Sequence, residues 1–486
     1  MQLPHLVENW IDGRSRSSVG GDSLPVIEPA TGAEIARMTA SGAADVALAQ
    51  SAAARAFPAW AALPAAERAA MLDRLAGLVE RDVERLALLE SADSGKPLAL
   101  ARSVDIPRAA ANLRFFADAV REWKADEDFR APHAVSRVIR RASGVAGCIS
   151  PWNLPLYLFT WKIAPALAAG CTVVAKPSEE TPMTAAALGE LSAEAGFPAG
   201  VLNVVQGRGA ECGAAIVRHP GIPVITFTGG TATGAHIMSV AGPMFKRTAL
   251  ELGGKNPTIV FADADFDAAV AGAVRAGFQN QGQICLCGSR VLVQREMYER
   301  FRDAFVERVR ALRVGDPIDA ATEQGSLVSA AHRAKVAAAV ERARAEGGRV
   351  LCGGRAPEQR ELPERVRGGA YWLPTVIDGL PMDCATNQEE IFGPVVTIQA
   401  FGDEADAVRL ANESVYGLAA NVWTADHARG MRMAEHLEFG IVWINTWMLR
   451  DLRVPFGGMK RSGVGREGGE EALRFFAEPK SVTWPA

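Results

Sequence analysis

The chain has 486 residues, a length typical of about three domains. Its 49% hydrophobic and 22% charged residues are ordinary for a water-soluble globular protein. The net charge of −4 provides no basic surface overall, so we expect no nucleic-acid partner. An anionic small molecule would therefore have to be bound by local arginines.

Targeting signals and metal-ligand patterns are not evident. Residues 1–12 lack the charged start and apolar stretch of a signal peptide. The longest apolar stretch, 163–175, is shorter than the roughly 20 residues that span a bilayer. Seven scattered cysteines are typical of a reducing compartment, and the dispersed histidines complete no metal site. We expect a cytoplasmic protein without membrane or metal, and we interpret all seven histidines as surface or packing residues.

Helical spacing comes first along the chain, and alternating strands and helices follow it. Long helices are expected at 43–60, 65–91 and 98–123. Beyond Gly144, short β-rich runs alternate with helices that begin near Pro182, Gly209 and Thr231, which predicts βαβ units in a parallel sheet. The strands expected in this part are 172–175, 201–205, 224–227 and 248–252.

A second α/β series follows, in which Asp265 is expected to cap a helix over 268–277. Its expected strands are 257–261, 290–294, 395–400 and 440–445. Two further strand-like segments, 134–141 and 480–484, fit neither series. Separate strands of this kind commonly serve as assembly arms.

The motif Glu251-Leu-Gly-Gly-Lys-Asn-Pro257 precedes Gly282-Gln-Ile-Cys285. A thiolate can attack a carbonyl, and a carboxylate can then activate water to release the acyl product. Each segment alone also fits a purely structural role, in which the cysteine is an inert packing residue and the glutamate a solvated charge. Together, in this order, they resemble the aldehyde dehydrogenase superfamily, and the Gly-Gln-x-Cys spacing selects Cys285, with Cys287 as a packing neighbour.

The resemblance covers essentially the whole chain and implies an α/β fold. It consists of two Rossmann-like open parallel-sheet domains and a small β oligomerisation arm. By this resemblance residues 1–119 and 143–253 form an NAD-binding domain, and 254–453 a catalytic domain. Residues 120–142 and 454–486 form the arm and C-terminal segment, which implies a homodimer or homotetramer.

The resemblance also implies an NAD site. Gly229, Thr231 and Gly234 match the family's Gly-x-Thr-x-x-Gly turn, although Gly230 replaces a serine that many members carry. By composition alone a tight turn is the favoured interpretation of this segment, and Lys176 and Glu179 fit solvated loop charges equally well. A carboxylate at the adenine ribose favours NAD over NADP. The implied cofactor-binding residues are Trp152, Lys176, Ser178, Glu179, Thr228, Gly229, Gly230, Thr231, Gly234, Leu252, Gly253, Glu390 and Phe392.

Three further positions complete the implied mechanism. In Pro151-Trp-Asn-Leu-Pro155, Asn153 either caps the next helix or, as the family implies, stabilises an oxyanion. By resemblance Cys285 forms a thioester, hydride passes to NAD, and Glu251 activates the hydrolytic water. Lys162 either relays that proton or is an ordinary lysine on a helix surface, which we favour.

The segments 105–108, 285–290 and 445–453 resemble 2-hydroxymuconate- and 2-aminomuconate-semialdehyde dehydrogenases in particular. In that subgroup two arginines clamp a distal carboxylate, a role that falls here on Arg108 and Arg450. The alternative is a surface charge for Arg108 and pairing of Arg450 or Arg453 with Asp451. The remaining implied substrate contacts are Leu154, Tyr157 and Phe456. Aliphatic, aromatic, betaine or succinate semialdehydes remain alternative substrates, and a non-catalytic binding protein on the same fold is a remote alternative.

Overall fold

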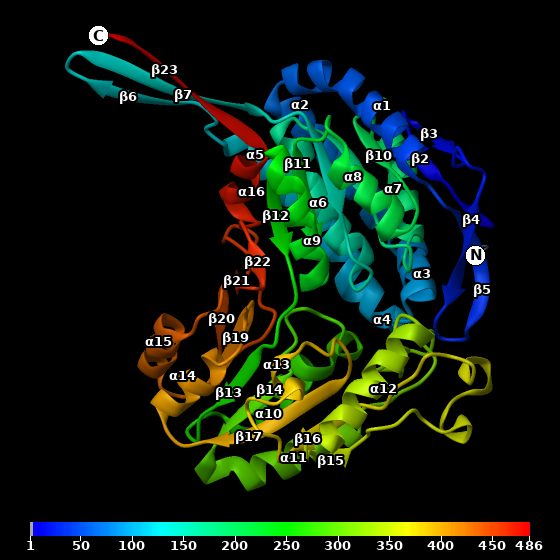
Figure 1. Ribbon diagram of the computed structural model, residues 1–486, viewed down its shortest axis with the longest axis vertical. Coiled ribbons are helices and arrows are strands. Elements are labelled where there is room, and N and C mark those ends of the chain that lie inside the picture. The colour runs from blue at the N-terminus through cyan, green and yellow to red at the C-terminus, as the bar shows by residue number, and fades with distance from the viewer. Residues whose placement is uncertain (1–2) are drawn as a thin grey trace.

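A computed structural model describes residues 3–486. Two lobes lie one above the other, and a narrow arm projects from the upper lobe (Figure 1). Each lobe is built on one sheet, and the strand order of the upper sheet is β22-β12-β11-β8-β9-β10-β2-β3. Its strands are β2 (Asn9–Ile11), β3 (Arg14–Arg16), β8 (Val145–Ile149), β9 (Thr172–Lys176), β10 (Leu202–Val204), β11 (Val224–Thr228), β12 (Arg247–Glu251) and β22 (Gly463–Val464).

The central strands β8 to β12 pair in parallel, which confirms the predicted βαβ alternation. These five strands are buried almost throughout, as expected where helices cover both faces of a sheet. A small sheet of β1 (Leu6–Val7), β4 (Ser23–Glu28) and β5 (Ala33–Thr39) flanks this lobe.

The helices of the upper lobe depart from the prediction at two places. The expected helix 65–91 is divided, because Asp82 leaves helical geometry and its carboxylate accepts hydrogen bonds from Arg81 and Arg85. The expected helix 98–123 contains a π-helical turn at Ala101–Asp105, just before Pro107. The helices are α1 (Ala43–Ala62), α2 (Ala65–Arg81), α3 (Val83–Ser94), α4 (Leu98–Leu100), α5 (Ile106–Glu122), α6 (Pro155–Ala169), α7 (Met183–Glu194), α8 (Ala214–Arg218), α9 (Thr231–Ala241) and α16 (Gly469–Phe475).

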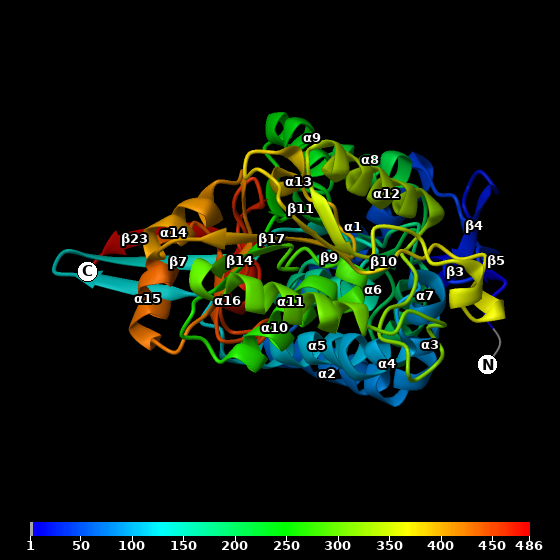
Figure 2. The same ribbon diagram turned by 90° about the horizontal axis from the view of Figure 1, so that it is seen from below.

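The lower sheet has the order β15-β16-β17-β14-β13-β19-β20, and only β15 is antiparallel within it. Asp265 caps α10 as predicted, since its carboxylate accepts from Ala268 N at 3.0 Å. The strands are β13 (Pro257–Val260), β14 (Arg290–Gln294), β15 (Arg349–Cys352), β16 (Thr375–Asp378), β17 (Val395–Phe401), β19 (Ala419–Trp423) and β20 (Ile441–Ile444). The helices are α10 (Phe266–Phe278), α11 (Tyr298–Arg310), α12 (Ala330–Ala345), α13 (Ala385–Gln388), α14 (Glu404–Asn412) and α15 (His427–His436); Figure 2 gives the view from below.

The arm is a three-stranded sheet of β6 (Glu127–Ala131), β7 (Ala134–Ala142) and β23 (Ala477–Pro485). Both predicted arm strands are therefore present, although the last 33 residues are not all arm. Of that segment only β23 lies in the arm sheet, whereas β22 extends the upper sheet and α16 packs on α6. The domain boundaries given above stay a prediction.

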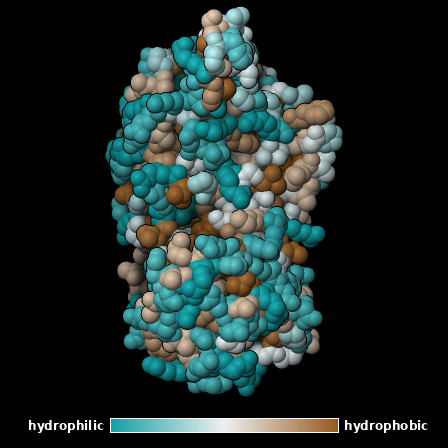
Figure 3. Space-filling model, turned by 90° about the vertical axis from the view of Figure 1, so that its left-hand side faces the viewer, coloured by the Kyte–Doolittle hydropathy of each residue, from teal (hydrophilic) through white to brown (hydrophobic). Residues whose placement is uncertain are grey.

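The motifs gather where the two lobes meet. Parallel strands β8, β9, β11 and β12 end at the same edge of the upper sheet, so the segments that follow them converge there. Residues 252–256 then cross from β12 to β13 and form the first connection between the lobes (Figure 1). On the face drawn in Figure 3, hydrophobic residues concentrate at about the level of this junction. A short sheet of β18 (Tyr416–Gly417) and β21 (Met459–Lys460) also lies at this level.

Candidate active site

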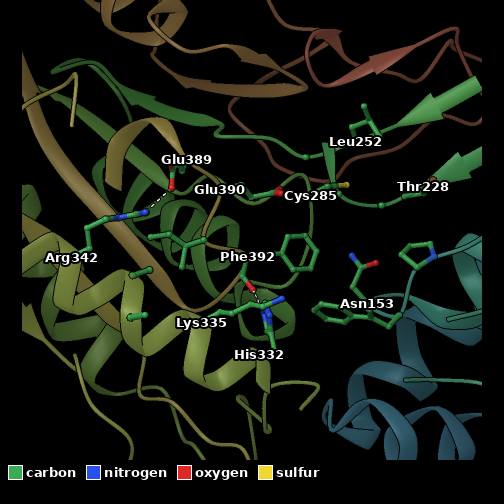
Figure 4. Close-up of a pocket in the computed structure, with 18 residues that line it drawn as sticks. Asn153, Thr228, Leu252, Cys285, His332, Lys335, Arg342, Glu389, Glu390 and Phe392 are labelled. Carbon is green, nitrogen blue, oxygen red and sulfur yellow. Dashed lines mark hydrogen bonds and ion pairs between the residues drawn. The ribbon is translucent and has the colours of Figure 1, made fainter. Parts of the chain in front are cut away.

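A cavity of about 680 Å³ lies at the junction of the lobes. Figure 4 shows Asn153, Thr228, Leu252 and Cys285 around it, with His332, Lys335 and Arg342 approaching from α12. The structure thus brings together segments that are distant in sequence. The predicted site residues that line the cavity are Trp152, Asn153, Thr228, Gly229, Gly230, Leu252, Gly253, Cys285, Glu390 and Phe392.

Cys285 is partly exposed and lies in an irregular loop between α10 and β14. Burial of its thiol, and then the negative charges of Glu390 and Glu251, raise the pKa of Cys285 above its ordinary value. The charge of Arg450 acts in the opposite direction. The thiol is therefore mostly protonated at neutral pH and needs a base before it can attack.

Asn153 does not cap the helix that follows it, because Leu154 occupies the N-cap position of α6. Its side-chain Nδ2 instead donates to the backbone oxygen of Gln283 at 2.9 Å, two residues before Cys285. An amide nitrogen carries two hydrogens, so the second remains for a ligand in the cavity. Asn153 O accepts from the buried ammonium of Lys96 at 3.1 Å, which fixes the backbone beneath the amide.

Glu251 is the last residue of β12 and is buried. Within residues 3–486 neither of its carboxylate oxygens has a hydrogen-bond partner. Burial raises the pKa of Glu251 well above its ordinary value, and the nearby charge of Glu467 raises it further. A buried carboxyl group with a raised pKa can accept a proton near neutral pH, as a general base must.

Our interpretation of Lys162 as a helix-surface residue is wrong. The Lys162 side chain is buried, and its Nζ donates to Glu467 Oε1 at 2.7 Å and to Thr226 Oγ1 at 3.0 Å. The helix α6 is buried on nearly every side, so a lysine there has no solvent-facing position. Glu467 could not be selected from the sequence, because the only signal was an acid eleven residues after Phe456.

A second cavity, of about 500 Å³, lies between α8 and α9. Phe227 lines this cavity while Thr228 and Gly229 line the first, so the turn after β11 separates the two. The predicted ribose ligands lie beside it: Glu179 Oε1 accepts from Gly209 N at 3.0 Å, and Gly209 lines the cavity. Glu179 also pairs with Lys176 Nζ at 3.2 Å, and Ser178 Oγ accepts from Glu180 N.

The turn itself fits a phosphate group. Gly230 is the N-cap of α9 and Thr231 its first residue, so unpaired backbone N–H groups face outward there. A Cβ at Gly229 would lie 2.3 Å from the Phe227 ring, and one at Gly234 would lie 2.5 Å from Leu252. At Gly230, in contrast, a Cβ would meet no atom within 4 Å.

Glu390 and Phe392 line the wall opposite this turn. Glu390 Oε1 accepts from Gly254 N at 2.9 Å, and burial raises the pKa of Glu390 to about 7. Phe392 has a φ of +57°, and its oxygen accepts from the His332 ring at 2.7 Å. His332 lines the cavity and packs against Trp152, which agrees with the packing role expected for the histidines.

The predicted substrate residues differ in how far the structure connects them to the cavity. Arg450 lies over the Phe456 ring at 4.1 Å and over the Trp161 ring at 5.2 Å, and its charge lowers the pKa of Glu251 and of Cys285. It is Arg453, and not Arg450, that pairs with Asp451, at 2.5 Å. Leu154, Tyr157 and Phe456 are buried in one hydrophobic cluster with Trp161.

Arg108 lies near the start of α5 and is half-buried. Within residues 3–486 its guanidinium has no ion pair or side-chain hydrogen bond. Across the same residues no three histidine, cysteine or acidic side chains gather as metal ligands. None of the helices described has both the length and the apolar character needed to cross a bilayer.

Comparison with known proteins agrees with this geometry. The model of the family described as "Aldehyde dehydrogenase family" matches residues 16–482. A 2-aminomuconic semialdehyde dehydrogenase of Danio rerio is 47% identical over 98% of each chain. A 2-hydroxymuconic semialdehyde dehydrogenase of Pseudomonas sp. strain CF600 is 44% identical over 98% of this chain and 99% of that one.

Among solved structures, PnpE in complex with nicotinamide adenine dinucleotide has a TM-score of 0.96 and 42% identity, covering 100% of this chain and 98% of that chain. The match spans both lobes and the arm, so it includes every motif described above. The chain belongs to the aldehyde dehydrogenase family, as its sequence motifs predicted.

Proposed function

We propose that this enzyme oxidises a semialdehyde that carries a distal carboxylate to the corresponding acid, with NAD as coenzyme. The observation that carries the proposal is that Cys285 and Asn153 line one cavity, while the buried carboxylate of Glu251 and the guanidinium of Arg450 lie close enough for their charges to act on the Cys285 thiol. Relatives that act on muconic semialdehydes are 44–47% identical over nearly the whole chain, which supports this substrate class.

Cys285 is the nucleophile in this proposal. Its sulfur attacks the aldehyde carbon, and the thiol proton leaves to a base. The free N–H of Asn153 and the backbone N–H of Cys285 then stabilise the oxyanion. Removal of one such donor typically costs about 100- to 1000-fold in rate. The hydrogen bond from Asn153 to Gln283 O holds the amide close to the loop that carries the thiol.

Glu251 acts as the general base for hydrolysis of the Cys285 thioester. Its unpartnered oxygens can accept a proton from water, and its raised pKa suits that transfer. The hydrogen-bonded set of Lys162, Thr226 and Glu467 lies nearby, because the charges of Lys162 and Glu467 both act on Glu251. We assign to this set the onward transfer of that proton.

The two cavities on either side of the turn after β11 fit the two halves of a dinucleotide. Lys176 and Glu179 would hold the adenine ribose, N–H groups at the start of α9 the phosphates, and Glu390 the nicotinamide ribose. Within the described part of the chain, the buried Thr228 Oγ1 has no hydrogen-bond partner, as expected for a group that meets a bound ligand. When bound, NAD accepts the hydride from the tetrahedral adduct.

Arg450 and Arg108 bind the distal carboxylate in this proposal. Arg450 stacks on two aromatic rings and has no acidic partner among the residues described, so its fork of N–H groups is available to an anion. An aldehyde dehydrogenase of other or broad specificity is the second candidate. We also propose that the arm joins copies of this chain into a homodimer or homotetramer, and that the enzyme is cytoplasmic.

The test is a substrate comparison with purified enzyme and NAD, followed by NADH absorbance. We expect kcat/KM for 2-hydroxymuconate or 2-aminomuconate semialdehyde to exceed that for benzaldehyde, hexanal, betaine aldehyde and succinate semialdehyde. Equal or lower values for the muconate compounds would favour the second candidate. Retention of NADH formation by Cys285→Ala would overturn the mechanism itself.

A further inference from the structure

The loop that carries Cys285 has no regular backbone pairing, yet its carbonyl groups are all held. Between residues 283 and 287, Ile284 O accepts from a backbone N–H of the loop itself, that of Cys287. Buried side chains from outside the loop donate to each of the other four carbonyls, although Cys287 O also accepts from Ser289 N at 2.9 Å. Gln283 O accepts from Asn153, Leu286 O accepts from Trp447 Nε1 at 2.9 Å, and the remaining two accept from Asn256.

Asn256 makes three hydrogen bonds from a fully enclosed position. Its Nδ2 donates to Cys285 O at 2.7 Å and to Cys287 O at 3.0 Å. Its Oδ1 accepts from the backbone N–H of Ala419, at the start of β19, at 3.0 Å. Because the side chain is 1% exposed, water cannot replace any of these bonds.

The loop packs closely against the segment that contains Asn256. A Cβ at Gly254 would lie 2.7 Å from Cys285 O and 2.6 Å from Asn256 Oδ1, so only glycine lets the loop approach this closely. Cys285 O has no other hydrogen-bond donor among residues 3–486. One amide therefore determines where the peptide after the nucleophile lies.

We propose that Asn256 is a positioning residue that keeps the thiol of Cys285 directed into the cavity. It does so by tying the carbonyls on both sides of Leu286 to the lower sheet. This inference rests on the proposed role of Cys285 as nucleophile. Glu251 and Asn256 stand at the two ends of the connection between the lobes, so the same short segment carries the base and sets the position of the thiol.

Asn203 offers a matched control. It is also buried, its Nδ2 donates to the backbone oxygens of Val173 and Gly200, and its Oδ1 accepts from the backbone N–H of Asp12. The same three kinds of bond are therefore lost in Asn203→Ala and in Asn256→Ala. Of these two asparagines, only Asn256 is bonded to the loop that carries Cys285.

The experiment compares Asn256→Ala, Asn203→Ala and the unaltered enzyme. It measures kcat per folded site, the dissociation constant for NAD, and the rate at which iodoacetamide alkylates each cysteine, located by mass spectrometry. Asn256→Ser, which retains one donor on a shorter side chain, serves if Asn256→Ala is insoluble. Alkylation needs neither aldehyde nor coenzyme, so it decides the inference even if the proposed substrate is wrong.

We expect Asn256→Ala to lower kcat about 10- to 100-fold, because a small displacement of a reacting group has effects of that size. Alkylation of Cys285 should become about three-fold faster or more as the freed loop exposes the thiol, while Cys352 and Cys148 keep their rates. The Kd for NAD should stay within about two-fold. The inference is overturned if Asn256→Ala keeps its kcat, if Asn203→Ala loses as much, or if all cysteines become more reactive together.

Discussion

The ammonium of Lys162 and the carboxylate of Glu467 form a buried ion pair, with Nζ 2.7 Å from Oε1, although 305 residues separate them. Thr226 Oγ1 donates to the same oxygen at 2.9 Å, and no group of residues 3–486 binds the buried Oε2 of Glu467. Both charges act on Glu251, in opposite directions. The protonation state of the proposed base therefore depends on two residues that are far apart in the sequence.

Replacement of Glu467 should shift the pH dependence of the hydrolytic step. Glu251 works as a base only when ionised, so the rate rises as the pH passes its pKa. The charge of Glu467 raises that pKa, and Glu467→Gln should therefore move the rising limb to lower pH, by about one unit. Glu470→Gln, an exposed change on the neighbouring helix α16, is the control. Stopped-flow measurement of thioester hydrolysis between pH 6 and about 10 makes the comparison. If the rate rises at the same pH in Glu467→Gln and in the unaltered enzyme, the effect of Glu467 on the pKa of Glu251 is contradicted.

The raised pKa of Glu251 also makes the stability of the fold depend on pH. A carboxyl group whose pKa is higher in the folded state stabilises the fold at low pH, and this contribution is lost as the pH rises through the folded value. A neutral amide at this position cannot ionise. Glu251→Gln should therefore raise the Tm relative to the unaltered enzyme, with a difference that grows steadily above the unfolded pKa of about 4.3. Calorimetry at several pH values checks this, and a constant difference would be the contrary result.

The role of Arg450 can be separated from that of its neighbour Arg453. Arg450→Ala should raise KM for a carboxylated semialdehyde about 10- to 100-fold, since it removes charge-assisted hydrogen bonds, and should change KM for benzaldehyde far less. Arg453 is exposed and already paired with Asp451, so Arg453→Ala should have little effect on either substrate. Steady-state kinetics with both aldehydes provide the measurement. Equal losses on the two substrates for Arg450→Ala would exclude the carboxylate clamp.

Adjacent glycines in the turn before α9 should respond in opposite ways to serine. Gly230 has a φ of −69° and open space where a Cβ would stand, so Gly230→Ser should fold normally. Its added hydroxyl can reach a phosphate, and we expect KM for NAD to fall about five-fold, the size of one net hydrogen bond. Gly229→Ser would collide with the Phe227 ring and should weaken coenzyme binding or folding. Titration with NAD distinguishes the two, and similar behaviour would refute the expected phosphate position.

Coenzyme preference should depend on the charge of Glu179. A carboxylate beside the adenine ribose repels a 2′-phosphate, so Glu179→Gln should raise kcat/KM for NADP, by about ten-fold. Glu180→Gln changes the next residue, which is exposed, and serves as the control. Parallel assays with NAD and NADP give the ratio. An unchanged ratio would mean that the ribose lies elsewhere.

Much of the fold could be predicted because its signals are local. The buried strands β9, β11 and β14 are β-branched runs of about the expected length, and Asp265 caps α10 by contacts within one turn. The break between α2 and α3 depends instead on a single residue, Asp82, whose carboxylate accepts hydrogen bonds from Arg81 and Arg85. Periodicity alone does not contain that information.

The active site divides in the same way. Motif spacing was sufficient to select Asn153 and Cys285, which line one cavity, and Glu251, whose charge acts on the Cys285 thiol. It was insufficient for Lys162, whose burial follows from the packing of α6, and for its partner Glu467. Likewise His332 becomes part of the cavity only because α12 packs against the segment that contains Phe392.

The short connection over residues 252–256 has a mechanical consequence. Glu251 precedes it, Gly254 N–H binds Glu390 within it, and Asn256 ends it. A rotation of one lobe against the other would therefore move the segments that hold Glu251, Glu390 and Cys285 together. A fixed orientation of the two lobes would therefore keep Glu251 and Cys285 aligned for both proposed half-reactions.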